Sequence, residues 1–263
     1  MLNVTISFSG GTDCLFLTWM LLQSPKYAVH LVRFMPENYL DFANGEIIRK
    51  TDREQIAVTD RILPWLANNM PQSFTFEYVD YLGDYDANYR MIHALEIVPY
   101  SAHRRASGRH KVDAVFVGQS ADNTGINGRQ ARAAQQRLSA IHDIPVQYPL
   151  LESNLGRAHA LAAMHPYLKT NNTSCINLDS HGYSCGKCYM CQLMRVMQDD
   201  LDAGKTASEI TAEYHAYREK LRSNPATNRD GGWFDTDHPK YGTGYGPPAY
   251  SVLYPEYAPL FIE

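Results

Sequence analysis

Short apolar runs alternate with longer amphipathic stretches over the first half of the chain. The runs are rich in β-branched and aromatic residues, which predicts buried strands, and the stretches between them repeat apolar residues at helical spacing. The predicted strands are residues 3–8, 28–34, 73–79 and 112–117, and the predicted helices are residues 14–22, 45–68, 88–107 and 129–141. Strands that alternate with helices indicate an α/β fold, with a mainly parallel sheet and helices on both faces.

The second half of the chain has a different pattern. Helices are predicted at residues 155–168, 191–201 and 206–221, the last with Thr206 or Ser208 as its N-cap and Glu209 in its first turn. Residues 224–263 contain 6 Pro, 5 Gly and 5 Tyr. That composition is typical of an extended arm on the surface, with a lid or a dimer arm as the alternatives. We therefore expect three parts: an α/β domain (1–150), a helical subdomain (151–223) and a C-terminal arm (224–263).

Composition narrows the class of protein. The chain has 263 residues, of which 44% are hydrophobic and 20% are charged, as is usual for a globular protein. A net charge of −4 argues against a dominant electrostatic grip on nucleic acid, although Arg104, Arg105 and Arg109 leave a local basic patch open. The longest apolar run, Leu15–Leu22, falls short of the ~20 residues that span a bilayer. With no basic segment before the first apolar stretch, we expect a cytoplasmic protein.

A glycine-rich turn joins the first predicted strand to the first predicted helix. Gly10 and Gly11 let the backbone approach a ligand closely, and the N-terminus of the following helix attracts anions. Ser9 adds a hydroxyl donor, and the carboxylate of Asp13 suits a Mg²⁺ ion beside phosphate oxygens. The sequence predicts a phosphate site here. The alternative is a plain strand–turn–helix corner, with Asp13 as a carboxylate at the helix N-terminus.

Four of the five cysteines fall within seventeen residues, at Cys175, Cys185, Cys188 and Cys191. In a chain without an export signal, such a cluster favours a metal site over disulfides. Four thiolates at this spacing predict a structural Zn²⁺ site, with Gly182 and Gly186 allowing the turns. An iron–sulfur cluster and unligated buried cysteines are the alternatives.

The glycine-rich turn resembles the Ser-Gly-Gly-x-Asp-Ser signature of the PP-loop ATP pyrophosphatases. Members of that superfamily cleave ATP between the α and β phosphates and adenylate a carboxylate or carbonyl oxygen. In this chain Cys14 stands at the last position, where the thiol is a weaker donor than a hydroxyl. The resemblance implies catalytic roles for Ser9 and Asp13. It also implies an ATP and Mg²⁺ site formed by Ser7, Ser9, Gly10, Gly11, Thr12, Asp13 and Cys14.

The turn and the cysteine segment together resemble the 7-cyano-7-deazaguanine synthases of the queuosine pathway. The segments Ser174–Asn177 and Val117–Gly118 match that family's pattern, and Tyr148–Leu151 matches its Pro-Leu strand end. The resemblance implies that Gly118, Asp122 and Arg129 complete the nucleotide and substrate site. It covers residues 3–200, and the arm lies outside it.

The substrate end departs from that family at residues 34–38, 124–129 and 156–159. The implied reaction converts a carboxylate like that of 7-carboxy-7-deazaguanine into an amide and then a nitrile. It consumes ATP and ammonia, the latter free or delivered by a partner, and releases AMP and pyrophosphate. Three alternatives stay open: another PP-loop amide-forming or tRNA-modifying enzyme, a non-catalytic nucleotide-binding component of an assembly, and a redox protein that uses Cys14. A homodimer is compatible with each.

Overall fold

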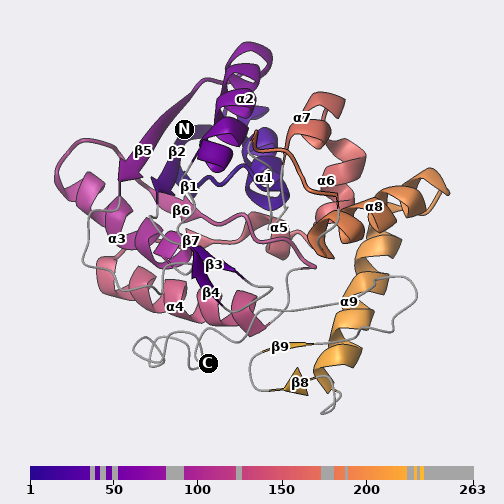
Figure 1. Cartoon of the computed structure of the whole chain (residues 1–263). Helices are drawn as coiled ribbons and strands as arrows, with labels where there is room; N and C mark the ends of the chain where they lie inside the picture. Colours follow the sequence, from indigo (N-terminus) through magenta and orange to yellow (C-terminus); the bar gives the residue numbers. More distant parts are fainter. Residues whose placement is uncertain are drawn as a thin grey trace.

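A parallel β-sheet forms the centre of the molecule (Figure 1). The computed structural model describes residues 1–35, 39–41, 46–48, 53–80, 92–122, 126–172, 181–186, 189–223, 228–229 and 232–233. Within those residues the central sheet has five strands in the order β5-β2-β1-β6-β7, and each neighbouring pair is parallel. The strands are β1 (Leu2–Ser7), β2 (Tyr27–Met35), β5 (Phe74–Asp80), β6 (Ala114–Phe116) and β7 (Val146–Gln147).

The strand order reverses beside β1. From β1 the chain adds β2 and then β5 on one side, and later returns to add β6 and then β7 on the other side. Loops that leave the carboxyl ends of β1 and β6 therefore diverge, and open α/β sheets bind ligands in the crevice at such a point. The topology places the predicted phosphate site at this crevice.

Helices cover both faces of the sheet, as the alternating pattern predicted (Figure 1). On one face, α1 and α2 bury apolar side chains such as Leu15 and Ile62 against Ile6 and Leu31 of the strands. On the other face, Ile97 of α3 packs in a second core with side chains of the strands. These helices are α1 (Thr12–Leu22), α2 (Arg53–Asn69), α3 (Ile92–Ala106) and α4 (Ile126–His142).

A separate hydrophobic cluster joins α6, α8 and α9. Leu161, Leu193, Met197 and Tyr214 are buried in it, at the side of the sheet core (Figure 1). The helices of the second half are α5 (Pro149–Glu152), α6 (Arg157–Ala163), α7 (Pro166–Asn171), α8 (Tyr189–Asp202) and α9 (Ala207–Ser223). None of the helices in the described part of the chain combines the length and apolarity needed to cross a membrane.

Three predicted elements were wrong in their extent. The helix predicted over 45–68 begins only at Arg53, because β4 (Glu46–Ile48) pairs antiparallel with β3 (Tyr39–Asp41). The helix predicted over 155–168 is broken into α6 and α7, since Pro166 lacks the N–H that a continuous helix needs. The Pro-Leu strand end at 148–151 is instead the start of α5, with Pro149 at its first position, and the strand β7 lies just before it.

Most of the predicted C-terminal arm lies outside the described residues. Within it, β8 (Asn228–Arg229) pairs antiparallel with β9 (Gly232–Trp233). The predicted division of the chain at residues 150 and 223 stays a prediction.

Candidate active site

A cavity of about 250 Å³ opens at the carboxyl ends of β1 and β6. Seven of the residues that the sequence assigned to nucleotide binding line it, together with residues of α3, β6 and α4. Its lining is Ser7, Ser9, Gly11, Thr12, Asp13, Cys14, Ile97, Phe116, Val117, Gly118 and Gln135. The volume lies just below the ~300 Å³ at which small-molecule sites begin. The cavity is therefore matched to part of a nucleotide, such as its phosphates.

Gly10 and Gly11 of the turn differ in backbone conformation and in structural role. Gly10 has φ +78°, a left-handed conformation, and a Cβ there would lie 2.6 Å from Cγ1 of Val58 on α2. Gly11 is the N-cap of α1 and has extended backbone angles. No side-chain group among the described residues caps this helix, so its first N–H groups can serve an anion.

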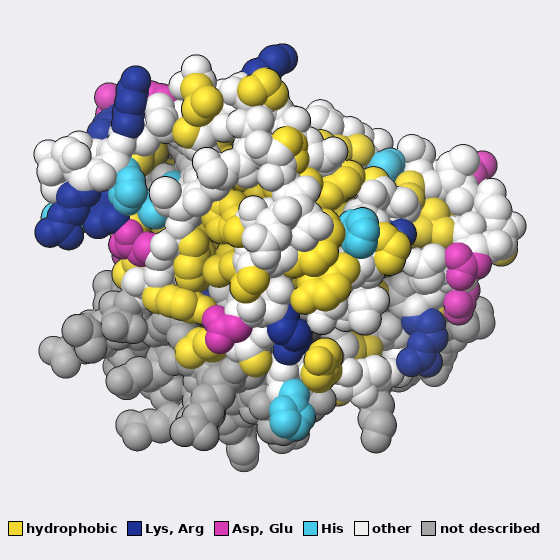
Figure 2. Space-filling model, turned by 90° about the horizontal axis from the view of Figure 1, so that it is seen from above, with side chains coloured by type: hydrophobic (Ala, Val, Ile, Leu, Met, Phe, Trp, Pro, Cys, Tyr) yellow, Lys and Arg dark blue, Asp and Glu magenta, His cyan; other side chains and the backbone are white. Residues whose placement is uncertain are grey.

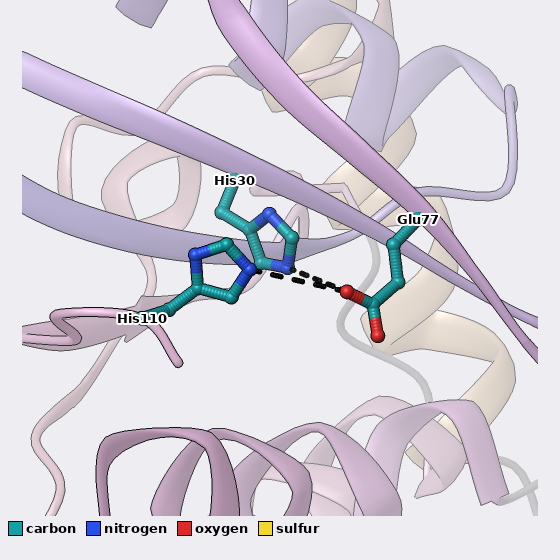
Figure 3. Close-up of side chains that lie close together, drawn as sticks. All are labelled: His30, Glu77 and His110. Carbon is teal, nitrogen blue, oxygen red and sulfur yellow. Dashed lines mark ion pairs between the residues drawn. The ribbon is translucent and has the colours of Figure 1, made fainter. Parts of the chain in front are cut away.

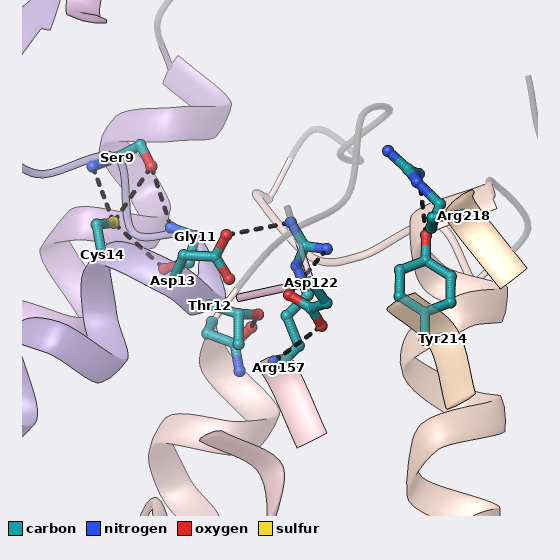
Figure 4. Close-up of polar contacts among 10 residues, drawn as sticks. Ser9, Gly11, Thr12, Asp13, Cys14, Asp122, Arg157, Tyr214 and Arg218 are labelled. Carbon is teal, nitrogen blue, oxygen red and sulfur yellow. Dashed lines mark hydrogen bonds and ion pairs between the residues drawn. The ribbon is translucent and has the colours of Figure 1, made fainter. Parts of the chain in front are cut away.

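The thiol of Cys14 contacts two other residues of the turn, Ser9 and Gly11 (Figure 4). Its Sγ accepts a hydrogen bond from the Ser9 N–H at 3.3 Å and donates to the Gly11 carbonyl oxygen at 3.2 Å. The Ser9 Oγ lies 3.3 Å from the same sulfur. Burial raises the pKa of the Cys14 thiol above its usual value, although the hydrogen bonds from Ser9 oppose this rise. The thiol is therefore protonated at neutral pH, which argues against a reactive redox cysteine.

Asp13 lies in a cluster of charged residues that was not predicted from the sequence. Arg157, in the first turn of α6, donates from Nη2 to Asp13 Oδ2 at 3.1 Å (Figure 4). The Nη1 of Arg157 lies 3.7 Å from Asp122 Oδ1, and its backbone N–H donates to Asp122 Oδ2 at 3.0 Å. The predicted residues Asp13 and Asp122 thus meet through one guanidinium at the edge of the cavity.

The carboxylate of Asp13 suits a cation. Its Oδ1 is buried and makes no hydrogen bond of standard geometry with the described residues, although the Ser120 hydroxyl lies near the carboxylate and lowers its pKa. Burial raises the pKa of Asp13, and the charge of Asp122 adds to that rise, while Arg157 opposes it. A Mg²⁺ ion that arrives with phosphates would satisfy this oxygen and favour the ionised carboxylate.

A buried arginine supports the turn from below. Arg33 of β2 is 1% exposed and donates from Nη1 to the Ser9 carbonyl oxygen at 2.7 Å and to Thr59 Oγ1 at 3.2 Å. Sequence reasoning missed this residue, although a cation inside an apolar strand was a usable signal. A buried positive charge beside the turn adds to its attraction for phosphate.

The remaining predicted residues have distinct surroundings. A Cβ on Gly118 would lie 2.6 Å from Cys14 Cα, so this glycine lets the end of β6 approach the start of α1. The Thr12 hydroxyl donates to Asn172 Oδ1 at 2.7 Å, which commits that side chain to tying α1 to α7. Arg129 lies in the first turn of α4 and is not among the described residues that line the cavity.

The cysteine segment is described only in part. Cys185 and Cys191 lie with their sulfurs 4.0 Å apart, whereas Cys175 and Cys188 lie outside the described residues. Two thiolates on one tetrahedral zinc, each at about 2.3 Å from it, are about 3.8 Å apart, so the observed spacing fits a shared ion. The two glycines expected to allow the turns of this segment have left-handed backbone angles, with φ +75° at Gly182 and +70° at Gly186.

An arginine ties this segment to the sheet domain. Arg61 of α2 donates to the carbonyl oxygens of His181 at 2.6 Å and Gly182 at 2.7 Å, and its guanidinium lies 4.2 Å from the ring centre of Tyr183. Seen from above, hydrophobic side chains occupy the centre of the molecular face and the densest group of Lys and Arg side chains lies at one edge (Figure 2). On this face the described residues form no continuous basic surface.

No model of a known protein family matches the sequence, and no curated protein matches it. Among solved structures, the chain is similar to the U34-tRNA thiolase NcsA from Methanococcus maripaludis with its 4Fe-4S cluster. The identity is 14% and the TM-score 0.36, over 84% of this chain and 72% of that one. It is also similar to a predicted subunit of tRNA methyltransferase from Methanocaldococcus jannaschii, with 14% identity and a TM-score of 0.27, over 57% and 69% of the two chains. At these TM-scores neither similarity decides the function, which rests on the site itself.

Proposed function

We propose that the protein is an ATP-dependent enzyme of the PP-loop type that adenylates a substrate carboxylate and releases pyrophosphate. The observation that carries this proposal is the position of the Ser9–Cys14 turn. It lies at the reversal of the strand order, beside a cavity that it lines, with Asp13 and Asp122 joined by Arg157 at the cavity edge. An uncapped helix N-terminus and a carboxylate with an unsatisfied oxygen are what a phosphate chain and its Mg²⁺ require.

Each group has a distinct task in this proposal. The N–H groups at the start of α1 and the Ser9 hydroxyl bind the β and γ phosphates, which become the leaving pyrophosphate. Asp13 would hold Mg²⁺, and the guanidinium of Arg157 beside it would stabilise the charge that develops on the α-phosphate. The protein contributes positioning and charge neutralisation, because the reacting atoms belong to ATP and the substrate.

The chemistry follows in three balanced steps. A substrate carboxylate oxygen attacks the α-phosphorus of ATP, the bond to the β-phosphate oxygen breaks, and pyrophosphate leaves. Ammonia then attacks the acyl carbon, loses a proton and displaces AMP, which gives an amide. A second ATP activates the amide oxygen in the same way, and loss of AMP and two protons gives the nitrile. For the substrate we propose a deazapurine carboxylate of the 7-carboxy-7-deazaguanine kind, on the strength of the sequence resemblance.

We also propose that Cys175, Cys185, Cys188 and Cys191 bind Zn²⁺. The 4.0 Å sulfur separation of Cys185 and Cys191 supports this. A closed set of four thiolates supplies no catalytic chemistry. It would fix the segment before α8 against Arg61 of α2, and so brace the helical part of the molecule.

The test is one incubation of the purified protein with Mg·ATP, ammonium and 7-carboxy-7-deazaguanine, with nucleotides and bases followed by mass spectrometry. We expect AMP, pyrophosphate and the nitrile from the wild type. Asp13→Asn should reduce AMP formation at least about a hundredfold, as is usual when a charged group that acts on the transition state is lost. The control Asp143→Asn changes a fully exposed carboxylate and should leave the rate unchanged.

Other outcomes distinguish the alternatives. AMP without the nitrile would keep the adenylation and require another carboxylate or a tRNA substrate. ATP binding without AMP under any condition would overturn the enzymatic proposal and favour a nucleotide-binding component. The contact between Arg157 and Asp13 is the observation that would favour that second reading, since it already neutralises the carboxylate.

A further inference from the structure

A second polar cluster lies on the sheet face that α3 covers. His30 on β2 and Glu77 on β5 project from neighbouring strands, and His110 lies over them from the segment between α3 and β6 (Figure 3). In the strand register His30 pairs with Thr75 and Val32 with Glu77, so the alternation of side chains puts His30 and Glu77 on one face. Nothing in the proposed adenylation uses these residues.

The three side chains converge at metal-binding distance. One ligand atom from each lies within 4.8 Å of the others, and the Nε2 atoms of His30 and His110 each lie 3.9 Å from Glu77 Oε2. Ligand atoms about 2.1 Å from a tetrahedral zinc ion are about 3.4 Å apart, so each histidine–carboxylate separation exceeds that spacing by roughly half an ångström. We propose that His30, Glu77 and His110 form a binding site for a divalent transition-metal cation.

The orientation of His30 favours this role. Its Nδ1 lies 2.7 Å from Thr75 Oγ1, and metal-binding histidines typically use the second ring nitrogen in such a hydrogen bond. With Nδ1–H donating to Thr75, Nε2 carries the lone pair, and it lies 3.2 Å from the Tyr100 hydroxyl and 3.9 Å from Glu77 Oε2, so a cation there would replace the contact with Tyr100. Burial, aided by the charge of His110, lowers the pKa of His30 to about 4.

The surroundings admit a cation. Arg104 of α3 contacts Glu77, and its guanidinium competes for the carboxylate. A carboxylate has two oxygens and about four acceptor directions, so the guanidinium and the ion can share it after a small rotation. A cavity of about 280 Å³ is lined by the two histidines His30 and His110 and by Thr75 among others, whereas Glu77 does not line it.

The donor set selects the class of ion. Two imidazoles and one carboxylate favour Zn²⁺, Co²⁺ or Fe²⁺ over Mg²⁺ and Ca²⁺, which prefer oxygen ligands. Three protein ligands leave at least one coordination position for water. The site differs from the cysteine segment in its ligands, so the two are distinguishable by spectroscopy.

The test measures Zn²⁺ binding by calorimetry and Co²⁺ binding by visible absorption, in a Cys185→Ser/Cys191→Ser background that removes two of the four thiolates of the proposed zinc site. We expect one ion per chain, with ligand-field bands of a nitrogen and oxygen site and no thiolate charge-transfer band. His110→Ala and Glu77→Gln should each weaken binding at least about tenfold. His103→Ala is the matched control, because His103 is an exposed histidine in the last turns of α3, shortly before the segment that carries His110.

His110 and Glu77 are the preferred positions for substitution because both are only partly buried, whereas His30 is 8% exposed and its replacement risks the fold. Circular dichroism checks that each variant is folded. As an independent readout, Zn²⁺ should raise the Tm of the parent and of His103→Ala but not that of His110→Ala. A folded parent that binds no Zn²⁺, or equal affinities in His110→Ala, Glu77→Gln and the parent, would overturn the proposal.

Discussion

Cys14 illustrates how one atom changes the chemistry of a turn without changing its shape. In the resembling signature a serine hydroxyl stands at this position, while here a sulfur binds Ser9 and Gly11 from inside the turn. The larger, less polar atom is buried, and its pKa is raised by that burial. The side chain of Cys14 therefore stabilises the conformation of the turn through these hydrogen bonds.

Native Cys14 should react slowly with iodoacetamide at pH 8, because the thiol is both inaccessible and protonated. Peptide mass spectrometry would follow the carbamidomethylation of Cys14 in the native and the urea-unfolded chain, with free cysteine as reference. We expect the native rate to be lower than both others. A native rate equal to that of free cysteine would revive the redox reading of this residue.

Gly118 is the position where added bulk should matter most for the turn. A Cβ there meets the backbone of Cys14 at 2.6 Å, and backbone atoms cannot move aside cheaply. We expect Gly118→Ala to lose about 3 kcal/mol of unfolding free energy and to weaken ATP binding at least about tenfold.

The control for Gly118 is Gly108→Ala. Gly108 has φ +66° with open space around its Cα, so the alanine should cost about 1 kcal/mol through backbone strain and leave ATP binding intact. Urea unfolding and calorimetry would measure both effects. Equal behaviour of the two variants would show that the contact with Cys14 does not limit the turn.

Residues close in sequence were the predictable part of the site. Ser9, Gly11 and Asp13 share a cavity because one turn carries them. Arg157 and Arg33 reach that turn from 144 and 24 residues away, and their place depends on how α6 and β2 pack. A single sequence gives the chemistry of such residues but not their neighbours.

At the scale of elements, the N-terminus of a helix could be predicted from the sequence where a capping residue was present, as it is in α9. Thr206 accepts from the Glu209 N–H at 3.2 Å, and Glu209 accepts from the Thr206 N–H at 2.8 Å, which closes a reciprocal cap on α9. Of the two caps predicted, Thr206 is confirmed. The helix then packs Ile210 and Tyr214 into the cluster with α6 and α8.

Thr206→Ala should lower the unfolding free energy by about 1 kcal/mol, as loss of an N-cap usually does. Thr206→Ser keeps the hydroxyl and should stay within a few tenths of a kcal/mol of the wild type. Urea denaturation followed by circular dichroism at 222 nm would measure both. If the alanine and serine variants were equally stable, the cap would contribute nothing.

Periodicity identified the long elements and failed for the short ones. The strands β1, β2 and β5 and the helices α4, α8 and α9 match their predicted ranges within a few residues. The hairpin of β3 and β4 escaped because three-residue strands are too short to show alternation. The two-residue β7 escaped for the same reason, although it completes the sheet edge beside β6.

At the scale of the whole molecule, the hydrogen bonds between Asn3 and Asp113 join the two halves of the sheet at the start of β1 and β6. The backbone N–H of Asn3 and its side-chain amide both donate to Asp113 Oδ2, at 2.8 and 2.6 Å, and the Asp113 N–H donates to the Asn3 carbonyl oxygen at 2.8 Å. The pairing of β1 with β6 begins there. The hydrogen bonds from Asn3 hold the pKa of Asp113 below its usual value.

A lowered pKa means that the folded state favours the ionised carboxylate. The stabilisation is complete above the unfolded-state pKa of about 3.9 and is lost as the pH falls through the lower folded-state value. Asp113→Asn should thus be less stable than the wild type at pH 7, and the difference should shrink below about pH 4. Urea midpoints at pH 7, 4 and 3 would measure it, with Asp143→Asn, an exposed carboxylate, as control. Parallel pH curves for wild type and Asp113→Asn would contradict the assignment.

The central place of β1 also sets an order of events during synthesis. β1 pairs with β2 on one side, but its other edge waits for β6, and about 80 residues separate the end of β2 from the start of β6. At roughly 5–20 residues per second, a ribosome takes about 4–16 s to make that stretch. Meanwhile the nascent chain presents the open edge of a strand that carries Val4 and Ile6, and such edges invite pairing with other chains. Expression yield should therefore depend on how quickly the codons between β2 and β6 are read, and on chaperones that cover β1 until β6 arrives.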